Sequence, residues 1–132
     1  MKTVIFACVH NAGRSQMAAA IFNKLADPTE ARALSAGTQP GKRVHPEVLE
    51  VMWEMDIDLT RAVPQLLTEQ MVAEATHLIT MGCGDACPVA PPSVRRLDWP
   101  LQDPQGQPLE RVREIRDDIQ ARVTELLSTL AA

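Results

Sequence analysis

The sequence predicts an α/β fold, in which a parallel β-sheet is covered by helices on both faces to form a single three-layer domain over residues 1–132. Three observations support this prediction. Strand-like and helix-like segments alternate along the chain, apolar residues make up 45% of it from one end to the other, and 132 residues suffice for one hydrophobic core. No internal repeat, low-complexity tract or linker divides the sequence.

The first half of the chain contains two predicted strands and two predicted helices. Residues 2–8 are apolar and β-branched, which is typical of a strand that is buried on both faces. A helical pattern follows over 15–26, and a second strand is predicted over 31–38. A proline at position 46 favours the first turn of a helix over 46–55.

The second half repeats the alternation. A helix is predicted over 66–75 with Thr68 as its cap, followed by strands over 76–81 and 94–99 and a long helix over 109–130. Alternating strands and helices imply a parallel sheet, because each helix carries the chain back to the start of the next strand. Ligands in such folds bind beyond the carboxyl ends of the strands.

The composition excludes several classes of protein. A net charge of −4 without a basic run argues against nucleic acid and against an anionic membrane surface as the main partner. No apolar stretch is long enough to span a membrane, and polar residues follow the apolar N-terminal run too soon for a signal peptide. We therefore expect a cytoplasmic protein whose three cysteines are reduced at rest rather than joined in a structural disulfide framework.

Residues 8–15, Cys-Val-His-Asn-Ala-Gly-Arg-Ser, join the first strand to the first helix. Such a turn directs backbone amides and the positive end of a helix dipole into one concavity, which suits an anion. Gly13 is expected to supply an unusual backbone conformation, Arg14 a planar fork of donors, and Ser15 either a hydrogen bond to Cys8 or a helix cap. The residues expected to bind an oxyanion are Val9, His10, Asn11, Ala12, Gly13, Arg14 and Ser15.

Cys8 has two interpretations. It could be a small buried hydrophobic residue at a strand end, with Arg14 a surface charge. Its position directly after the first strand and before a helix favours instead a nucleophile whose ionised sulfur is stabilised by amides and by the guanidinium.

The loop Cys8-x5-Arg14-Ser15, together with Asp103-Pro104 near the C-terminus, resembles the low-molecular-weight tyrosine phosphatase superfamily. More narrowly, the segments CVHNAGRSQMA, SAGT, ITMGCGDACP and DWPLQDP resemble the arsenate reductases built on that fold, in the same order along the chain. The resemblance implies a four-stranded parallel sheet, an oxyanion loop, Cys8 as the nucleophile and Asp103 as the general acid.

A reductase needs further thiols, and the chain has two, Cys83 and Cys87. In the favoured interpretation Cys8 attacks arsenate while Asp103 protonates the departing oxygen. Cys83 then attacks the Cys8 sulfur and releases arsenite, and Cys87 resolves the disulfide for an external reductant. The resemblance leaves two kinds of reductant open, thioredoxin or a low-molecular-weight thiol such as mycothiol with its glutaredoxin system, and in the second kind Cys87 is dispensable.

Other interpretations remain for these residues. Cys83 and Cys87 could be inert thiols or half of a zinc site, although His10, His45 and His77 lack paired metal spacing, so we expect no metal and no cofactor. Asp98 is the carboxylate that competes with Asp103. Ser35 is expected to support the loop by hydrogen bonding to Asn11.

A phosphatase is the main alternative function, because arsenate and phosphate share shape and charge. The related phosphotyrosine enzymes carry aromatic residues after Asp-Pro, whereas here Gln105-Gly106-Gln107 follows and the chain has no tyrosine. A module that binds phosphate or arsenate without turnover is a third possibility, against which Cys8, Arg14 and Asp103 together argue. We expect the protein to act as a monomer.

Overall fold

The computed structural model describes residues 1–82 and 90–130, and its elements follow the predicted order. They are β1 (Lys2–Cys8), α1 (Arg14–Leu25), β2 (Ala31–Gly37), α2 (Pro46–Trp53), α3 (Glu69–Glu74), β3 (His77–Thr80), β4 (Arg95–Asp98) and α4 (Leu109–Leu130). Most predicted boundaries differ from these by one or two residues, and the long helix over 109–130 has the predicted ends.

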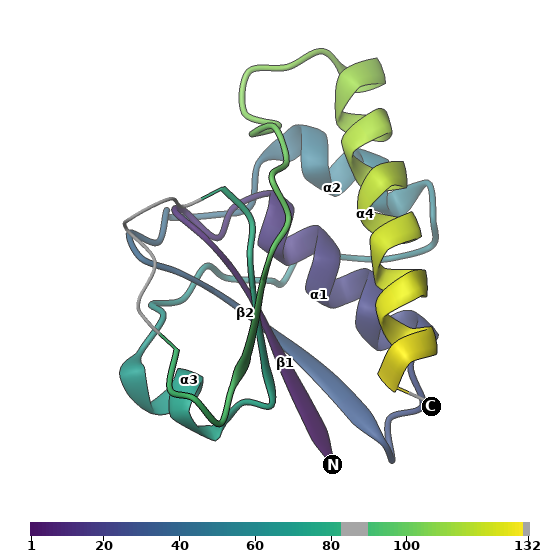
Figure 1. The fold of residues 1–132 in the computed structure, drawn as a ribbon. Helices are drawn as coiled ribbons and strands as arrows, with labels where there is room; N and C mark the ends of the chain where they lie inside the picture. Colours follow the sequence, from purple (N-terminus) through teal and green to yellow (C-terminus); the bar gives the residue numbers. More distant parts are fainter. Residues whose placement is uncertain (83–89, 131–132) are drawn as a thin grey trace.

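The four strands form one parallel sheet in the order β2-β1-β3-β4 (Figure 1). The register aligns Cys8 with Gly37 on one side of β1 and Ala7 with Thr80 on the other. The carboxyl ends of the strands therefore lie together along one edge, and the loops that follow them meet there.

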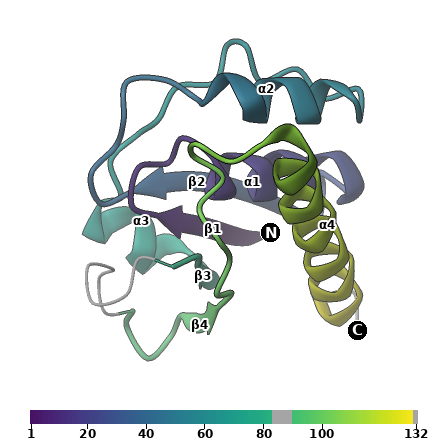
Figure 2. The same cartoon turned by 90° about the horizontal axis from the view of Figure 1, so that it is seen from above.

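Helices cover both faces of the sheet, which confirms the three-layer prediction (Figure 2). Side chains of β1 alternate between the two faces, as the period of a strand requires. Val4, Phe6 and Cys8 join the larger core under α1, α2 and α4, whereas Ile5 and Ala7 join the smaller core that α3 covers.

A small aromatic cluster joins three parts of the chain in the larger core. The ring of Phe6 in β1 lies 6.1 Å from that of Phe22 in α1, edge to face, and 5.5 Å from that of Trp99 after β4. Aromatic pairs at these separations are mutually attractive beyond their burial. The cluster fixes the chain after β4 relative to β1, on which Cys8 lies.

The third predicted helix begins later than the sequence analysis suggested. Leu66 forms a parallel bridge with Gly37 instead of a helical turn, and the Gly37 amide donates to the Gln65 carbonyl at 2.9 Å. Helix α3 starts at Glu69, where the hydroxyl of Thr68 accepts the Met71 amide at 3.1 Å. Thr68 is thus the N-cap as predicted, but the apolar residues before it extend the edge of β2.

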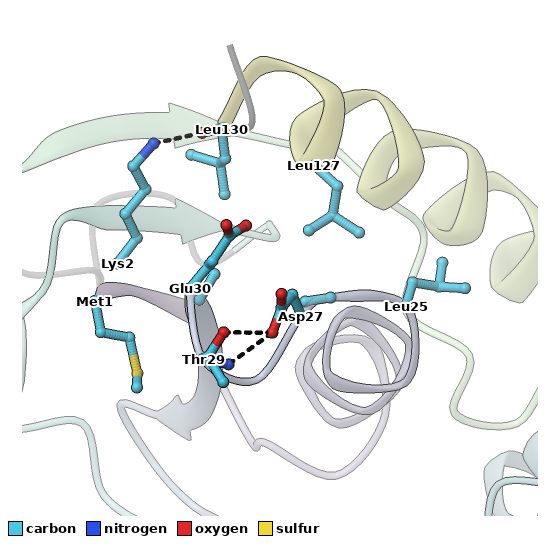
Figure 3. A pocket seen from close by; sticks show the side chains of 10 residues that line it. Met1, Lys2, Leu25, Asp27, Thr29, Glu30, Leu127 and Leu130 are labelled. Atoms are coloured by element: carbon cyan, nitrogen blue, oxygen red, sulfur yellow. Dashed lines mark hydrogen bonds between the residues drawn. The ribbon is translucent and has the colours of Figure 1, made fainter.

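A hollow of about 500 Å³ lies at the amino ends of β1 and β2, on the side of the sheet away from the Cys8 loop (Figure 3). Lys2 donates across it to the Leu130 carbonyl, and the Asp27 carboxylate accepts the amide and hydroxyl of Thr29 at 2.9 and 2.7 Å. Within residues 1–82 and 90–130, no helix combines the length and the apolar character needed to cross a membrane.

Glu54, directly after α2, connects that helix to α4. Its carboxylate accepts hydrogen bonds from Arg113 at 2.8 Å and from Arg116 at 2.7 Å. The hydrogen bonds from Arg113, and then those from Arg116, lower the pKa of Glu54 from 4.5 to about 2. A carboxylate with a lowered pKa stabilises the folded state most where it is ionised in both states.

We expect Glu54→Gln to lower the Tm by a few degrees at neutral pH, because both arginines lose an ionised acceptor. The stabilisation by Glu54 is complete above its unfolded value of 4.5 and is lost as the pH falls toward its folded value of about 2. Thermal unfolding followed by circular dichroism should therefore show the Tm difference between wild type and variant closing over that range.

Glu114→Gln is the matched control, since Glu114 forms a single exposed pair with Arg111 at 2.8 Å. Exposed pairs of this kind contribute little, so its Tm should stay close to that of the wild type. A Tm difference for Glu54→Gln that persisted unchanged at pH 2 would contradict the ionic interpretation.

Candidate active site

The sulfur of Cys8 lies at the carboxyl end of β1 and is nearly covered, with 2% of the residue exposed. Its Sγ accepts the backbone amide of Asn11 at 3.2 Å and lies 2.9 Å from the hydroxyl of Ser15. Ser15 therefore serves as the partner of Cys8 rather than as a cap, and Gly13 occupies the N-cap position of α1.

The carbonyl groups of the loop are all held by hydrogen bonds, which fixes the direction of its amides. Each carbonyl from residue 8 to residue 13 accepts a hydrogen bond from elsewhere in the described chain. The donors are the backbone amides of Thr38, Gln39, Gly41, His45 and Met17 and the side-chain amide of Gln16.

In a trans peptide the next amide points opposite to the carbonyl. Residues 8–14 contain no cis peptide bond. Each amide from residue 9 to residue 14 therefore points away from the group that donates to the carbonyl before it. The Asn11 amide, for example, points at the sulfur of Cys8. An amide directed in this way, next to the N-terminus of α1, is suited to an anion.

Two residues of the loop, Asn11 and Gly13, have unusual backbone conformations. The φ of Asn11 is +51°, in the left-handed region that asparagine tolerates better than most residues. Gly13 has a φ of −144° and a ψ of −90°, outside both the extended and the helical regions. The fully buried side chain of Asn11 donates to the Ser15 hydroxyl at 2.7 Å and accepts the Gln65 amide at 3.0 Å. Gly13 thus has the unusual conformation that was expected, whereas the positive φ of Asn11 was not predicted.

Ser35 does not contact Asn11 in the way the sequence analysis expected. Within the described residues the hydrogen bonds of the Asn11 side chain go to Ser15, Gln16 and Gln65. Gln65 links Ser35 to Asn11. Its side-chain amide donates to the Ser35 carbonyl at 2.8 Å, and its backbone amide donates to the side chain of Asn11. Gln16 and Gln65 were not identified from the sequence, where an isolated glutamine carries no recognisable signal.

Arg14 begins α1 and is 8% exposed. Its Nη1 donates to the Leu101 carbonyl at 3.0 Å, and its Nη2 lies 3.8 Å from Oδ2 of Asp103. Gly82 closes the third side: its φ is +87°, and a Cβ at this position would lie 2.6 Å from Nη1 of Arg14. The guanidinium is thus held at the site by two segments, the one that follows β4 and the one that follows β3.

Asp103 lies opposite the loop on the segment that follows β4. Its side chain is 45% exposed, and its Oδ1 accepts the Gln105 amide at 2.9 Å. The neighbouring Pro104 is buried against the loop, because a Cβ on Gly13 would lie only 2.7 Å from Cγ of Pro104. Gly13 therefore provides the space that lets the Asp103 segment approach the loop.

The remaining predicted residues divide into those near the sulfur and those apart from it. His10 is exposed, and its Nδ1 lies 3.1 Å from the Gln39 carbonyl, so its ring points away from Cys8. Asp98, the competing carboxylate, accepts the Thr80 hydroxyl at 2.7 Å at the end of β4. Ala12 is buried and Val9 is partly buried within the loop.

Cys83 and Cys87 lie in residues 83–89, outside the residues that the structure describes. Their positions therefore remain predictions. The last described residue before them, Gly82, lies against the guanidinium of Arg14. The chain thus reaches the site one residue before Cys83.

The fold and the site define the class of this protein: a thiol-dependent enzyme with an oxyanion loop on a parallel sheet. The model of the low molecular weight phosphotyrosine protein phosphatase family matches residues 3–132, and the chain belongs to this family.

Individual relatives are named as arsenate reductases. Arsenate reductase 1 of Bacillus cereus is 36% identical over 132 residues, which cover 97% of this chain and 96% of the relative. The structure of the thioredoxin-dependent arsenate reductase of Corynebacterium glutamicum matches with a TM-score of 0.83 at 37% identity. The match covers 99% of this chain but 62% of that one. An arsenate reductase in its phosphate binding state matches with a TM-score of 0.83 at 31% identity over 98% of this chain and 99% of the other.

Substitutions at Asn11 should separate the backbone and side-chain contributions to the loop. We expect Asn11→Ala to lower the free energy of unfolding by about 2–4 kcal/mol, because it removes buried hydrogen bonds and places an ordinary residue at positive φ. Asn11→Gly removes the same hydrogen bonds but accepts that φ, so it should recover about 1 kcal/mol. Urea denaturation measures both, and equal losses would show that the left-handed conformation carries no cost.

Proposed function

We propose that this protein reduces arsenate to arsenite with Cys8 as the nucleophile and a thiol as the source of electrons. The observation that carries the proposal is the sulfur of Cys8 within the amide loop, 3.2 Å from the Asn11 amide, with Arg14 and Asp103 held together at 3.8 Å beside it. The similarity to arsenate reductases along almost the whole chain supports the same substrate.

Binding of the oxyanion rests on fixed donors. The amides of residues 9–14 cannot turn away without breaking the hydrogen bonds of their carbonyls, so they need no reorganisation when the anion arrives. The Arg14 guanidinium offers two further N–H groups in a plane that matches two oxygens of a tetrahedral anion. Arsenate and phosphate fit such a site equally well.

The first chemical step joins sulfur to arsenic. The Cys8 thiolate attacks the arsenic atom, and one oxygen leaves as Asp103 transfers a proton to it. The carboxyl of Asp103 is 45% exposed, and its neighbour Pro104 packs against Gly13 and keeps it near the loop. The product is an arsenic–sulfur bond to Cys8.

The second step transfers two electrons. The thiolate of Cys83 attacks the sulfur of Cys8, the arsenic leaves with the electron pair of the arsenic–sulfur bond, and As(V) becomes As(III). A Cys8–Cys83 disulfide remains. Cys87 then attacks Cys83, which frees Cys8 and leaves a Cys83–Cys87 disulfide for thioredoxin or a small thiol to reduce.

A phosphatase is the second candidate, favoured by the same loop and by the family to which the chain belongs. The Asp103 segment continues with exposed Gln105 and Gly106 and provides no aromatic wall for a phosphotyrosine ring. We therefore propose only slow hydrolysis of aryl phosphates as a side activity of the reductase.

Arsenite release from arsenate and dithiothreitol is the primary test. Cys8→Ser and Cys83→Ser should abolish turnover, because each removes a sulfur that changes oxidation state. Cys87→Ser should keep turnover with a small thiol and lose it with thioredoxin if the complete relay operates. Mass spectrometry after one turnover should find the Cys8–Cys83 disulfide in the Cys87 variant. Fast hydrolysis of an aryl phosphate without any arsenite release would reverse the choice of function.

The general acid can be tested apart from the nucleophile. Asp103→Asn should lower kcat about 10²–10³-fold, as loss of a general acid usually does. Gly13→Ala should also lower kcat, because its Cβ would meet Pro104 at 2.7 Å and displace Asp103. Both variants should still be protected by phosphate against alkylation of Cys8. Asp98→Asn is the control, and a larger loss in it than in Asp103→Asn would transfer the role to Asp98.

A further inference from the structure

A second hollow, of about 230 Å³, lies between β4 and α4. Helix α4 packs against α1 and α2, and it leaves this space beside β4, which is the last strand of the sheet. Alternate residues of β4 and of the chain after it line one wall, because they share one face of the strand: Arg95, Leu97 and Trp99.

The opposite wall comes from one face of α4. The residues that line it follow the spacing i, i+3, i+4 and i+7 of such a face: Arg122, Glu125, Leu126 and Thr129. The hollow is thus bounded by two regular elements that are far apart in the sequence.

The bottom of the hollow is apolar and its rim is charged. Trp99 is 8% exposed and Leu126 is 6% exposed, and both belong to the larger core, against which Leu97 also packs. Arg95 and Glu125 are exposed. Apolar walls with a few charged groups are the usual composition of a site for a small organic molecule.

Two of the charged residues that line the hollow have no ionic partner in the part of the chain that the structure describes. Arg122 donates to the Asp118 carboxylate at 3.0 Å. Arg95 and Glu125, by contrast, form no ion pair with each other or with any other residue of residues 1–82 and 90–130. One unpaired cation on β4 and one unpaired anion on α4 therefore border the same space.

His77 of β3 also lines the hollow, and its environment indicates which group carries the positive charge there. Burial, and then the positive charges of Arg95 and Lys2, lower the pKa of His77. The imidazole is therefore neutral at neutral pH, and Arg95 is the group that can attract an anion.

Size and charge together define the ligand. About eight water molecules would fill 230 Å³, which corresponds to a ligand of on the order of ten non-hydrogen atoms. A carboxylate complements Arg95, an ammonium group complements Glu125, and an apolar side chain complements the bottom of the hollow. A free amino acid with an apolar side chain carries all three groups on one small molecule.

We propose that the hollow between β4 and α4 binds a free amino acid with an apolar side chain, at a site separate from the Cys8 loop. Arg95 binds its carboxylate, and Glu125 binds its ammonium group. Trp99 contacts its side chain and also starts the segment that leads to Asp103, so the ligand touches the chain that reaches the active site. The inference goes beyond the proposed function and does not depend on it.

Trp99 allows binding to be measured directly. The chain has two tryptophans, and Trp53 is 66% exposed and does not line the hollow. Trp53→Phe therefore leaves Trp99 as the single fluorescent reporter. The probe is L-leucine, compared with isocaproate, which lacks the amino group, isoamylamine, which lacks the carboxylate, and glycine, which lacks the apolar side chain. Backbone amide NMR of the full chain, titrated with the same four compounds, provides the second measurement.

We expect leucine to bind saturably and each of the other compounds to bind about tenfold more weakly, because each lacks one of the three contacts. Arg95→Gln should weaken leucine and isocaproate about tenfold and should leave isoamylamine within about twofold. Glu125→Gln should weaken leucine and isoamylamine by a similar factor and should leave isocaproate unchanged.

Arg96→Gln is the matched control, because it removes the same charge from the next residue of β4, which lies on the other face of the strand. It should bind all four compounds as the parent protein does. A loss in this control as large as that in Arg95→Gln would show only a general effect of charge and would overturn the assignment of Arg95.

Three further outcomes would overturn the inference. Equal affinity for leucine and isocaproate would show that the ammonium group is not recognised, and equal affinity for leucine and isoamylamine would show the same of the carboxylate. Absence of saturable change both in the fluorescence of Trp99 and in the amide signals of residues 95–99 and 122–129 would refute the site itself. None of these results bears on arsenite release, which tests the proposed function separately.

Discussion

The geometry of the site depends on the hydrogen bonds that hold the carbonyl groups of residues 8–13. The stretch from Thr38 to His45 supplies most of the donors through its backbone amides. If these peptide planes turned over, carbonyl dipoles would face the sulfur of Cys8 and would repel both a thiolate and an oxyanion. Because the donors are backbone groups, the constraint lies in the path of the chain and depends little on which side chains the stretch carries.

The parallel sheet brings the other parts of the site to the same edge. Arg14 is held by the Leu101 carbonyl and by the close approach of Gly82, which follow β4 and β3 respectively. These segments meet because the strands share one direction and their carboxyl ends align. The contacts of Phe6 with Phe22 and Trp99 then fix the segment after β4 against β1. The candidate catalytic groups are therefore held in place by the same core that stabilises the fold.

Sequence patterns predicted the parts of the site that have a fixed spacing or a distinctive residue type. Cys8, Arg14 and Ser15 lie within eight residues on a strand–helix turn, and Asp103-Pro104 occurs after the last strand. Gln16 and Gln65 escaped prediction because they act on Asn11 through tertiary contacts. The start of the third helix was placed too early for a similar reason. The residues that follow Leu66 have a helical pattern in the sequence, but in the structure Leu66 pairs with Gly37 at the free edge of β2.

The sequence by itself determined the order of strands and helices and the position of the loop after the first strand, with its cysteine and arginine. These features follow from local periodicity and short spacing, which act over a few residues. Only the tertiary structure decided which loop residue takes a positive φ, why Gly13 must be small and which residues of β4 and α4 line one hollow. Each of these depends on segments that are distant in sequence, and no local pattern encodes which of them meet.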